Sequence, residues 1–544
     1  MKATVRQLRP SVIVAISAGF LALYAVLGAK ALNLDGLGYA GRVQSGDPAG
    51  LLLPGHLFYG PIMHALYRVA TVFSPGVDAA RLMQVADSVF AAAGVGVFIA
   101  ALRRLSVGPF AAVTAGVALG VTYTYWTHAT DLTTYAFSTF CLICAFYLMC
   151  GARSSAKAAP AWPTAAMVAL ATLIHQSNLV FLPAAMLGAS AGGSRNVLKL
   201  GALSLLLICL PYAWLGSVAT QSRSPMVIAK WAARGAHGYA PTFEPVNLAR
   251  GVYGFANAVV YLDDAGTAIK GHAANIDGSG LSTRDLLRFA CKAGFVIALV
   301  GAPSAAYLGR RKLSDEQRWA ARVCVAWIAP YTLVALMFFT TDHDRWIMLL
   351  PAVATLAAVA YPNPSARGRR AAVAAVGILF ALNLTSTVYP AHLGTGNRYY
   401  QEAVGLAPEL DDADLVIFWG HDHMGTAGYL RQMRPVEAYH LIDMVLRRGK
   451  ARALRDLTRM VSDAKHAQRR VLVIGLFGVH DRASDYLSEA DSLGVTRADV
   501  LGSLSSFDAR AAFPSGDGAA YELKALPRKH ERGNARNESE VQLQ

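Results

Sequence analysis

Long apolar stretches, each about as long as a bilayer is thick, constrain the fold of this chain more than any other feature. A membrane-spanning helix needs about 20 consecutive apolar residues, and the sequence supplies them at 11–29, 82–102, 108–126, 134–151, 199–217, 288–308, 320–341, 346–362 and 371–390. Charged residues make up only 16% of the 544 residues, against about 25% in soluble proteins. The pattern therefore excludes an intrinsically disordered chain and a fully soluble one.

Two more apolar stretches are ambiguous, and the distribution of basic residues decides how we interpret them. The stretch 162–190 is too long for one span, and 51–73 is interrupted by prolines, histidines and an arginine. Cytoplasmic loops of membrane proteins carry an excess of Lys and Arg. If 162–190 forms two short spans and 51–73 lies along the membrane surface, every basic cluster falls on one side: Lys2/Arg6/Arg9, Arg103/Arg104, Arg153/Lys157, Arg195/Lys199, Arg310–Lys312 and Arg367–Arg370. We therefore predict a polytopic α-helical membrane protein with about 11 spans and a cytoplasmic amino terminus.

This topology places the chemically interesting loops outside the cytoplasm. The outer side receives 30–80, 127–133, 175–178, 218–287, 342–345 and everything after 390, whereas the cytoplasmic loops are short and basic. The predicted organisation is a multi-pass module in the inner or plasma membrane at 1–390, an extracytoplasmic α/β domain at 391–525 and a disordered tail at 526–544. The α/β assignment rests on strand-like runs at 415–419 and 471–476 that alternate with helical stretches around 425–433 and 440–460.

The first outer loop holds two groups of candidate functional residues. Asp35 directly follows the first span and precedes glycines and Tyr39. A carboxylate held there can serve as a base near the membrane surface; the alternative is an Asp-Gly turn that ends a helix. His56 and His64 share one face of an interfacial helix, which either lines a cleft or lies at headgroup depth.

Two further aspartates stand out near the second, third and fourth spans. His128 and Asp131 lie in a short outer link, where they form either a functional pair or, for Asp131, the cap of the next helix. Asp87 lies within the second span, and carboxylates inside a membrane are functional candidates by default. Its alternative role is a buried polar contact with another span.

A later outer link reads Asp342-His343-Asp344-Arg345-Trp346. An outward arginine at the membrane surface can bind phosphate through paired donors, or it can act with Trp346 as an interface anchor. In the outer domain, His421 and His423 stand at alternate positions after a strand. They indicate either a metal site or a polar turn.

Taken together and in this order, these motifs resemble membrane glycosyltransferases of the GT-C fold, and more narrowly the bacterial protein-O-mannosyltransferase-like group. The resemblance rests on four pieces of sequence: Asp35 followed by Gly55–Pro61, Asp131–Tyr135, Leu173–Leu179 with His175 and Asn178, and Val416–His423 followed by Tyr429 and Arg434-Pro435. The proline that follows the histidine in the family's first motif is missing here, since Leu57 follows His56.

The resemblance implies an enzyme, a hexosyltransferase that inverts the anomeric carbon. It would transfer a sugar from a polyprenyl-phosphate donor in the lipid bilayer to an extracytoplasmic acceptor, which is a protein, a lipid or a glycan; no nucleic acid is involved. Asp35 would be the general base, and Asp131 would position the acceptor or share that role. The donor phosphate would be bound by Arg345, His343, Arg42 and His56, and the substrate by His128, Tyr39, His175 and Asn178. Participation of a divalent cation is left open.

Two other classes of protein remain compatible with the sequence. Many spans with a few buried polar groups also suit a transporter or lipid flippase, although no internal repeat is visible. A polysaccharide ligase or polymerase of another fold would use the long loop 218–287, which contains Arg234 and His237.

Overall fold

The computed structural model describes residues 8–154, 161–233, 243–262, 287, 290–299, 313–338, 340–419, 423, 425–476, 494–515 and 518–525. The chain divides into two compact units, Met1–Leu393 and Gly394–Gln544. The predicted tail at 526–544, the residues Arg234 and His237, and His421 of the predicted histidine pair lie outside the described residues.

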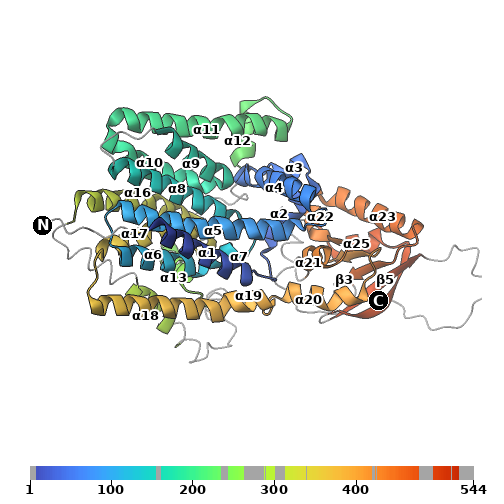
Figure 1. Ribbon diagram of the computed structural model, residues 1–544. Coiled ribbons are helices and arrows are strands. Elements are labelled where there is room, and N and C mark those ends of the chain that lie inside the picture. The colour runs from blue at the N-terminus through green and yellow to red at the C-terminus, as the bar shows by residue number, and fades with distance from the viewer. Residues whose placement is uncertain are drawn as a thin grey trace, which may run out of the picture. The chain divides into compact units, whose positions relative to one another are not determined.

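The first unit is a bundle of helices connected by short links (Figure 1). Its α-helices are α1 (Pro10–Val26), α2 (Leu34–Ser45), α3 (Pro48–Leu51), α4 (Tyr59–Phe73), α5 (Ala79–Arg104), α6 (Pro109–Val121), α7 (Tyr123–Thr130), α8 (Thr134–Ser154), α9 (Ala161–Ile174), α10 (Leu182–Ala189), α11 (Ser194–Thr220), α12 (Pro225–Ala233), α13 (Val246–Val259), α16 (Asp315–Met337), α17 (Leu350–Ala360), α18 (Ala366–Asn383) and α19 (Tyr389–Leu393). Short 3-10 segments η1 (Pro54–His56), η2 (Gln176–Phe181), η3 (Ser190–Gly192) and η5 (His343–Leu349) and the π-helical η6 (Leu384–Val388) complete it.

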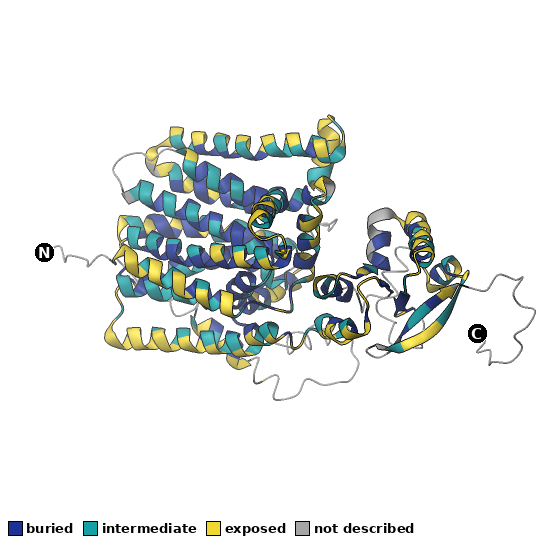
Figure 2. Cartoon of the chain, turned by 45° about the vertical axis from the view of Figure 1, so that its right-hand side comes forward, coloured by how far each residue is buried: buried dark blue, intermediate teal, exposed yellow. Residues whose placement is uncertain are grey.

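Several of these helices have the length and composition of membrane spans. Among the described residues, five helical stretches qualify: Ala79–Arg104, Thr134–Arg153, Ser194–Thr220, Asp315–Met337 and Ala366–Glu409. Peripheral helices have exposed residues along their outward faces (Figure 2). On α11 these include the apolar Leu206, Leu210 and Trp214. Because a helix with apolar residues on its outward face needs an apolar surrounding, the bundle is that of a polytopic membrane protein, as predicted.

The helix boundaries refine several of the predicted spans. The stretch 162–190 is divided into α9 and α10 by η2, at the polar cluster where the sequence indicated a break. The stretch 108–126 is divided as well, because Thr122 adopts an extended conformation between α6 and α7. Most of the predicted surface segment 51–73 forms the 15-residue helix α4, which exposes Val69, Val72 and Phe73.

Helix α5 is the central helix of the bundle and is buried along most of its length (Figure 2). It begins where the Asp78 side chain accepts hydrogen bonds from the backbone N–H groups of Ala80 and Arg81, which is the preferred way to cap a helix. Its neighbours α1, α6, α7 and α8 pack along it. The beginning of α5 therefore lies beside the end of α7 and the beginning of α8.

The second unit is a small α/β fold. Its helices are α20 (Arg398–Leu406), α21 (Thr426–Met433), α22 (Leu441–Arg448), α23 (Lys450–His466) and α25 (Arg497–Ser503), with the 3-10 turn η7 (Ala407–Glu409). The strands β1 (Leu415–Phe418), β2 (Glu437–His440), β3 (Val471–Ile474), β4 (Phe507–Ser515) and β5 (Gly518–Ala525) form one sheet in the order β2-β1-β3-β5-β4.

The sheet is parallel on one side and antiparallel on the other. Strand β1 pairs in parallel with β2 and β3, and β5 pairs antiparallel with β3 and β4. The four residues of β1 and the four of β3 are all buried, as expected of parallel strands covered on both faces. The sequence predicted these two strands correctly, whereas it missed β2 and the antiparallel pair.

Candidate active site

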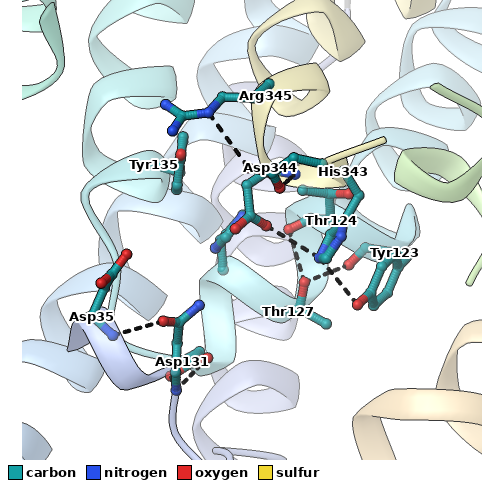
Figure 3. Close-up of polar contacts among 12 residues, drawn as sticks. Asp35, Tyr123, Thr124, Thr127, Asp131, Tyr135, His343, Asp344 and Arg345 are labelled. Carbon is teal, nitrogen blue, oxygen red and sulfur yellow. Dashed lines mark hydrogen bonds and ion pairs between the residues drawn. The ribbon is translucent and has the colours of Figure 1, made fainter. Parts of the chain in front are cut away.

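Three links between helices, far apart in the sequence, meet in one recess at an end of the bundle. One is the loop around α2, one joins α7 to α8, and one follows α16. The empty volume of the recess is about 360 Å³, and its lining residues are Asn33, Asp35, Tyr39, His56, Leu132, Thr133, Thr134, Tyr135, Asp344 and Arg345. Asp35 and Arg345, which the sequence assigned separately to base and phosphate chemistry, therefore lie in the same recess (Figure 3).

Asp35 is held in place by the way α2 begins. The Asn33 side chain accepts a hydrogen bond of 2.9 Å from the Asp35 backbone N–H and so caps the helix. Gly36 then lies against the α7–α8 link, because a Cβ atom at this position would be 2.6 Å from the Leu132 Cβ. Asp35 and Gly36 thus lie in the first turn of α2, which packs closely against Leu132. They do not form the helix-ending turn that was the alternative interpretation.

Asp131 lies behind this arrangement and ends α7 in an extended conformation. Its two carboxylate oxygens accept hydrogen bonds from the Asn33 backbone N–H at 3.0 and 3.1 Å, and one of them also accepts from the Leu132 N–H at 2.7 Å. Burial raises the pKa of Asp131 to about 6, even though these two N–H groups and His128 lower it. Asp131 therefore anchors the beginning of α2, the helix that carries Asp35.

Asp344 lies in an environment that lowers its pKa, whereas the environment of Asp131 raises the pKa of that residue. Its Oδ1 lies 2.9 Å from His128 Nε2 and 3.1 Å from His343 Nε2. Burial alone would raise the pKa of Asp344, but His343, His128 and Arg345 together hold it well below its usual range. Tyr123 extends the network, since its hydroxyl lies 3.1 Å from His343 Nε2 (Figure 3).

Arg345 is the cation of the recess. Its Nε lies 3.5 Å from Asp342 Oδ2, and its side chain is 24% exposed. Burial lowers the pKa of the guanidinium, but Tyr135, Asp342, Asp344 and Asp35 more than compensate and raise it above its ordinary value. Figure 3 shows Arg345 beside Tyr135. A permanently charged, partly exposed guanidinium beside carboxylates is suited to binding a phosphate group.

A row of aromatic rings forms the wall between these charges. The His56 and His175 rings are 4.8 Å apart, His175 and Tyr135 are 4.8 Å apart, and Tyr135 and His128 are 4.7 Å apart. The Tyr39 ring meets His56 edge-on at 5.7 Å. Four of the residues that the sequence proposed for substrate or phosphate binding therefore form one row of rings with Tyr135, in which Tyr39, His56 and Tyr135 line the recess and His128 and His175 are buried.

Asn178 and Arg42 lie apart from this row of rings and, like Asp131, His128, His175 and His343, are not among the residues that line the recess. Asn178 is fully buried, donates to the Ala171 carbonyl at 2.9 Å and accepts from the Tyr331 hydroxyl at 2.5 Å. The Arg42 guanidinium lies over the Tyr39 ring, 5.8 Å from its centroid. Conversely, sequence reasoning did not select Asn33, Leu132, Thr133, Thr134 or Asp344, although the short outer links 127–133 and 342–345 were a signal for Leu132, Thr133 and Asp344.

One cluster has the composition of a cation site. Within the described part of the chain, Asp342, His343 and Asp344 bring one potential ligand atom each to within 4.8 Å of one another. Their ligand atoms already take part in the contacts with His128 and Arg345.

Of the two histidines that the sequence proposed for a metal site in the outer domain, His423 is described. Its Nδ1 lies 2.7 Å from Glu402 Oε1, in the second unit.

Comparison with known proteins identifies the fold. No protein-family model matches the sequence, and no curated protein matches it significantly. The structure is similar to the crystal structure of ArnT from Cupriavidus metallidurans bound to undecaprenyl phosphate, with 13% sequence identity, a TM-score of 0.55, and coverage of 95% of this chain and 99% of that one. The oligosaccharyltransferase AglB from Archaeoglobus fulgidus, in complex with an inhibitory peptide and a dolichol-phosphate, is 11% identical with a TM-score of 0.45, over 96% of this chain and 74% of that one.

The similarity to ArnT shows that this chain has the GT-C fold of polytopic membrane glycosyltransferases. This confirms the predicted fold class, whereas the count of about 11 spans stays a prediction. The resemblance to the narrower protein-O-mannosyltransferase-like group stays a prediction.

Proposed function

We propose that this protein is a membrane glycosyltransferase that moves a sugar from a polyprenyl-phosphate-linked donor to an acceptor hydroxyl outside the cytoplasm. One observation carries the proposal: a carboxylate, Asp35, and a guanidinium, Arg345, line the same recess at the ends of the membrane helices. The two groups needed to activate a hydroxyl and to stabilise a leaving phosphate are thus brought together. That ArnT, a protein of the same fold, was solved with undecaprenyl phosphate supports the donor class.

The layout suits a donor whose tail remains in the bilayer. The sugar–phosphate bond of such a lipid lies at the membrane surface, and the recess is built from the links that join spanning helices. Arg345 would donate two hydrogen bonds to the phosphate, where negative charge increases as the sugar leaves. His343 and His56, which the sequence also assigned to phosphate binding, would act from the two sides of the recess.

The reaction is a single displacement that inverts the anomeric carbon. Asp35 removes the proton of the acceptor hydroxyl, and the acceptor oxygen forms a bond with the anomeric carbon. The bond between that carbon and the phosphate oxygen breaks, and its electron pair leaves with the polyprenyl phosphate. General-base assistance of this kind is worth about 10²–10⁴ in rate.

Asp131 then has a supporting role. Its carboxylate is engaged by the backbone N–H groups of Asn33 and Leu132, so it holds the helix that presents Asp35. His128 and His343 keep Asp344 ionised, and Asp344 contributes to the charge balance around Arg345. The aromatic rings of Tyr39 and His56, which line the recess, offer faces against which a sugar can pack.

The orientation follows from the distribution of basic residues in the sequence. We propose that the amino terminus is cytoplasmic and that the recess and the second unit are extracytoplasmic, because polyprenyl-linked sugars must meet an acceptor on that side. The acceptor is a hydroxyl of a protein, a lipid or a glycan.

The test is transfer of labelled sugar by the purified protein. A panel of radiolabelled polyprenyl-phosphate sugars is incubated with the protein in lipid nanodiscs and with membrane extract. The wild type should label an acceptor with one donor, and Asp35→Asn should lower the rate about 10²-fold or more. Asp47→Asn is the matched control, because it removes a carboxylate from the same loop outside the recess lining.

Two outcomes would overturn the proposal. If Asp35→Asn and Asp47→Asn transfer sugar equally well, Asp35 is not the base. If no donor in the panel is consumed, while fluorescent lipid crosses the bilayer of vesicles containing the wild type, the protein is a lipid transporter.

A further inference from the structure

Helix α5 carries three buried polar side chains on one face, inside the apolar bundle. Gln84, Asp87 and Ser88 are each less than 5% exposed, and their spacing of three and four residues places them on the same side of the helix. Polar groups at such positions are unfavourable unless they are hydrogen-bonded. Their hydrogen-bond partners therefore indicate which parts of the bundle this face of α5 holds in place.

All three side chains bind either the end of α7 or the link that leads from it to α8. Gln84 Nε2 donates to the Thr130 carbonyl at 2.6 Å and to the Ala29 carbonyl at 2.9 Å, and Ser88 Oγ donates to the Ala129 carbonyl at 2.7 Å. The last carbonyls of a helix have no partner within it. Gln84 and Ser88 thus satisfy the end of α7 immediately before Asp131.

Asp87 forms a hydrogen bond with the link beyond Asp131, at a residue that lines the recess. Its Oδ2 accepts a hydrogen bond from the Thr133 backbone N–H at 3.0 Å and one from the Tyr59 hydroxyl at 3.4 Å. Thr133 belongs to the lining, and the Tyr59 ring meets Tyr39, another lining residue, edge-on at 5.4 Å. The other oxygen, Oδ1, is buried without a hydrogen-bond partner among the described residues.

We propose that Asp87 is a positioning residue that joins the two walls of the recess. One wall is the first half of α2, with Asp35 and Tyr39, and the other consists of the α7–α8 link and the first two residues of α8, 131–135. Asp87 contacts both, through Tyr59 and Thr133, but it is not part of the lining itself. The effect of Asp87 on sugar transfer rests on the proposed function; its effect on the position of the link does not.

The experiment compares four variants in lipid nanodiscs. Asp87→Ala removes the oxygen that accepts both hydrogen bonds. Asp87→Asn keeps an amide oxygen, which can still accept hydrogen bonds from the Thr133 N–H and the Tyr59 hydroxyl. Tyr59→Phe removes only the hydroxyl group and covers the case in which Asp87→Ala does not fold. Tyr24→Phe is its matched control, because Tyr24 is also fully buried and donates to a backbone carbonyl, that of Gly120, at 2.8 Å.

Two measurements are made on each variant. Hydrogen–deuterium exchange of the amides of 132–135 reports on the link without any substrate, and the kinetics of sugar transfer report on the recess. Asp87→Ala should accelerate exchange about tenfold or more and lower kcat about tenfold or more, with the donor KM within about threefold. Asp87→Asn should stay within about threefold of the wild type in both. Tyr59→Phe should fall between them, and Tyr24→Phe should match the wild type.

The outcomes separate the two proposals. Unchanged exchange in Asp87→Ala, or an equal loss in Asp87→Asn and Asp87→Ala, overturns the positioning role, even if the wild type transfers sugar. Faster exchange in Asp87→Ala with no transfer by the wild type from any donor supports the positioning role and rejects the proposed function.

Discussion

Two short links at the same end of the bundle, 131–133 and 342–345, both carry aspartates, but they place the carboxyl groups in opposite environments. Asp131 is desolvated and bound by backbone N–H groups, and its pKa is raised to about 6. Asp344 lies between two histidines and an arginine, and its pKa is lowered. Environments that separate the pKa values of neighbouring acids indicate different roles. The first link can change its charge near neutral pH, whereas the second keeps a fixed arrangement of charges around Arg345.

The largest effect should come from the cation of the second link. Arg345→Ala should lower kcat/KM for the donor about 10²–10³-fold, because a group that stabilises the leaving phosphate is lost. Arg345→Lys should recover part of this, since lysine keeps the charge without the paired donors. Arg42→Ala is the comparison variant, because Arg42 is outside the recess lining; an equal loss in Arg42→Ala would contradict the special role of Arg345.

Asp344→Asn should have the next largest effect. The substitution removes the charge that two histidines share, and one charge-assisted hydrogen bond contributes about 1.5–3 kcal/mol, roughly 10- to 100-fold in rate. The kcat/KM for the donor, measured for Asp344→Asn and the wild type side by side, checks this expectation. An unchanged kcat/KM in Asp344→Asn would mean that Asp344 does not organise this link.

The first link should make activity depend on pH. Since the pKa of Asp131 is about 6, its carboxylate is lost below that pH, and with it the anchor of α2. We expect the transfer rate of the wild type to fall as the pH drops through about 6, and this dependence to be absent in Asp131→Asn. A wild-type rate that is constant between about pH 5 and 7 would contradict this expectation.

Stability should respond to pH in the opposite direction. Because the pKa of Asp131 is raised in the folded protein, folding favours its protonated form, so its contribution to stability is present at acidic pH and is lost as the pH rises through about 6. Asp131→Asn should therefore gain thermal stability relative to the wild type between about pH 4 and 7. A melting-temperature difference that is the same at every pH would show that Asp131 does not titrate in this range.

The smallest effect on catalysis should come from Asn178. Both ends of its side chain are hydrogen-bonded inside the bundle, so Asn178→Ala should lower the free energy of unfolding by about 1–3 kcal/mol. The kcat of the folded fraction should stay within about twofold of the wild type. A loss of kcat without a loss of stability would instead support the substrate-binding role that the sequence suggested.

Much of the fold could be predicted from the sequence, because helices that span a membrane consist of long, nearly uncharged apolar runs. Apolar runs located most of the helices, and the polar residues His175–Asn178 marked the break between α9 and α10. The break at Thr122 was missed because it lies between apolar residues and needs only one extended residue. Strand β2, with an exposed Glu437 at its start, was missed because four residues do not establish a strand pattern.

The recess was predicted in part, for a similar reason. Charged residues in the outer loops and links identified Asp35, Asp131 and Arg345 individually, because charges are rare in this chain. The sequence does not reveal that Asp131 faces the backbone of Asn33 while Asp35 faces the recess, because this depends on packing of α2 against Leu132. It also gave no partner for Asp87, since Thr133 contributes a backbone N–H and not a side chain.

The central claim is that the phosphate of a polyprenyl lipid binds beside Arg345, within reach of Asp35. An experimental structure of the protein in lipid nanodiscs with undecaprenyl phosphate tests it most directly. We predict density for the phosphate next to the Arg345 guanidinium, with the lipid chain running into the bilayer. Phosphate density at the other end of the bundle, beside Arg103 and Arg104, would contradict the account.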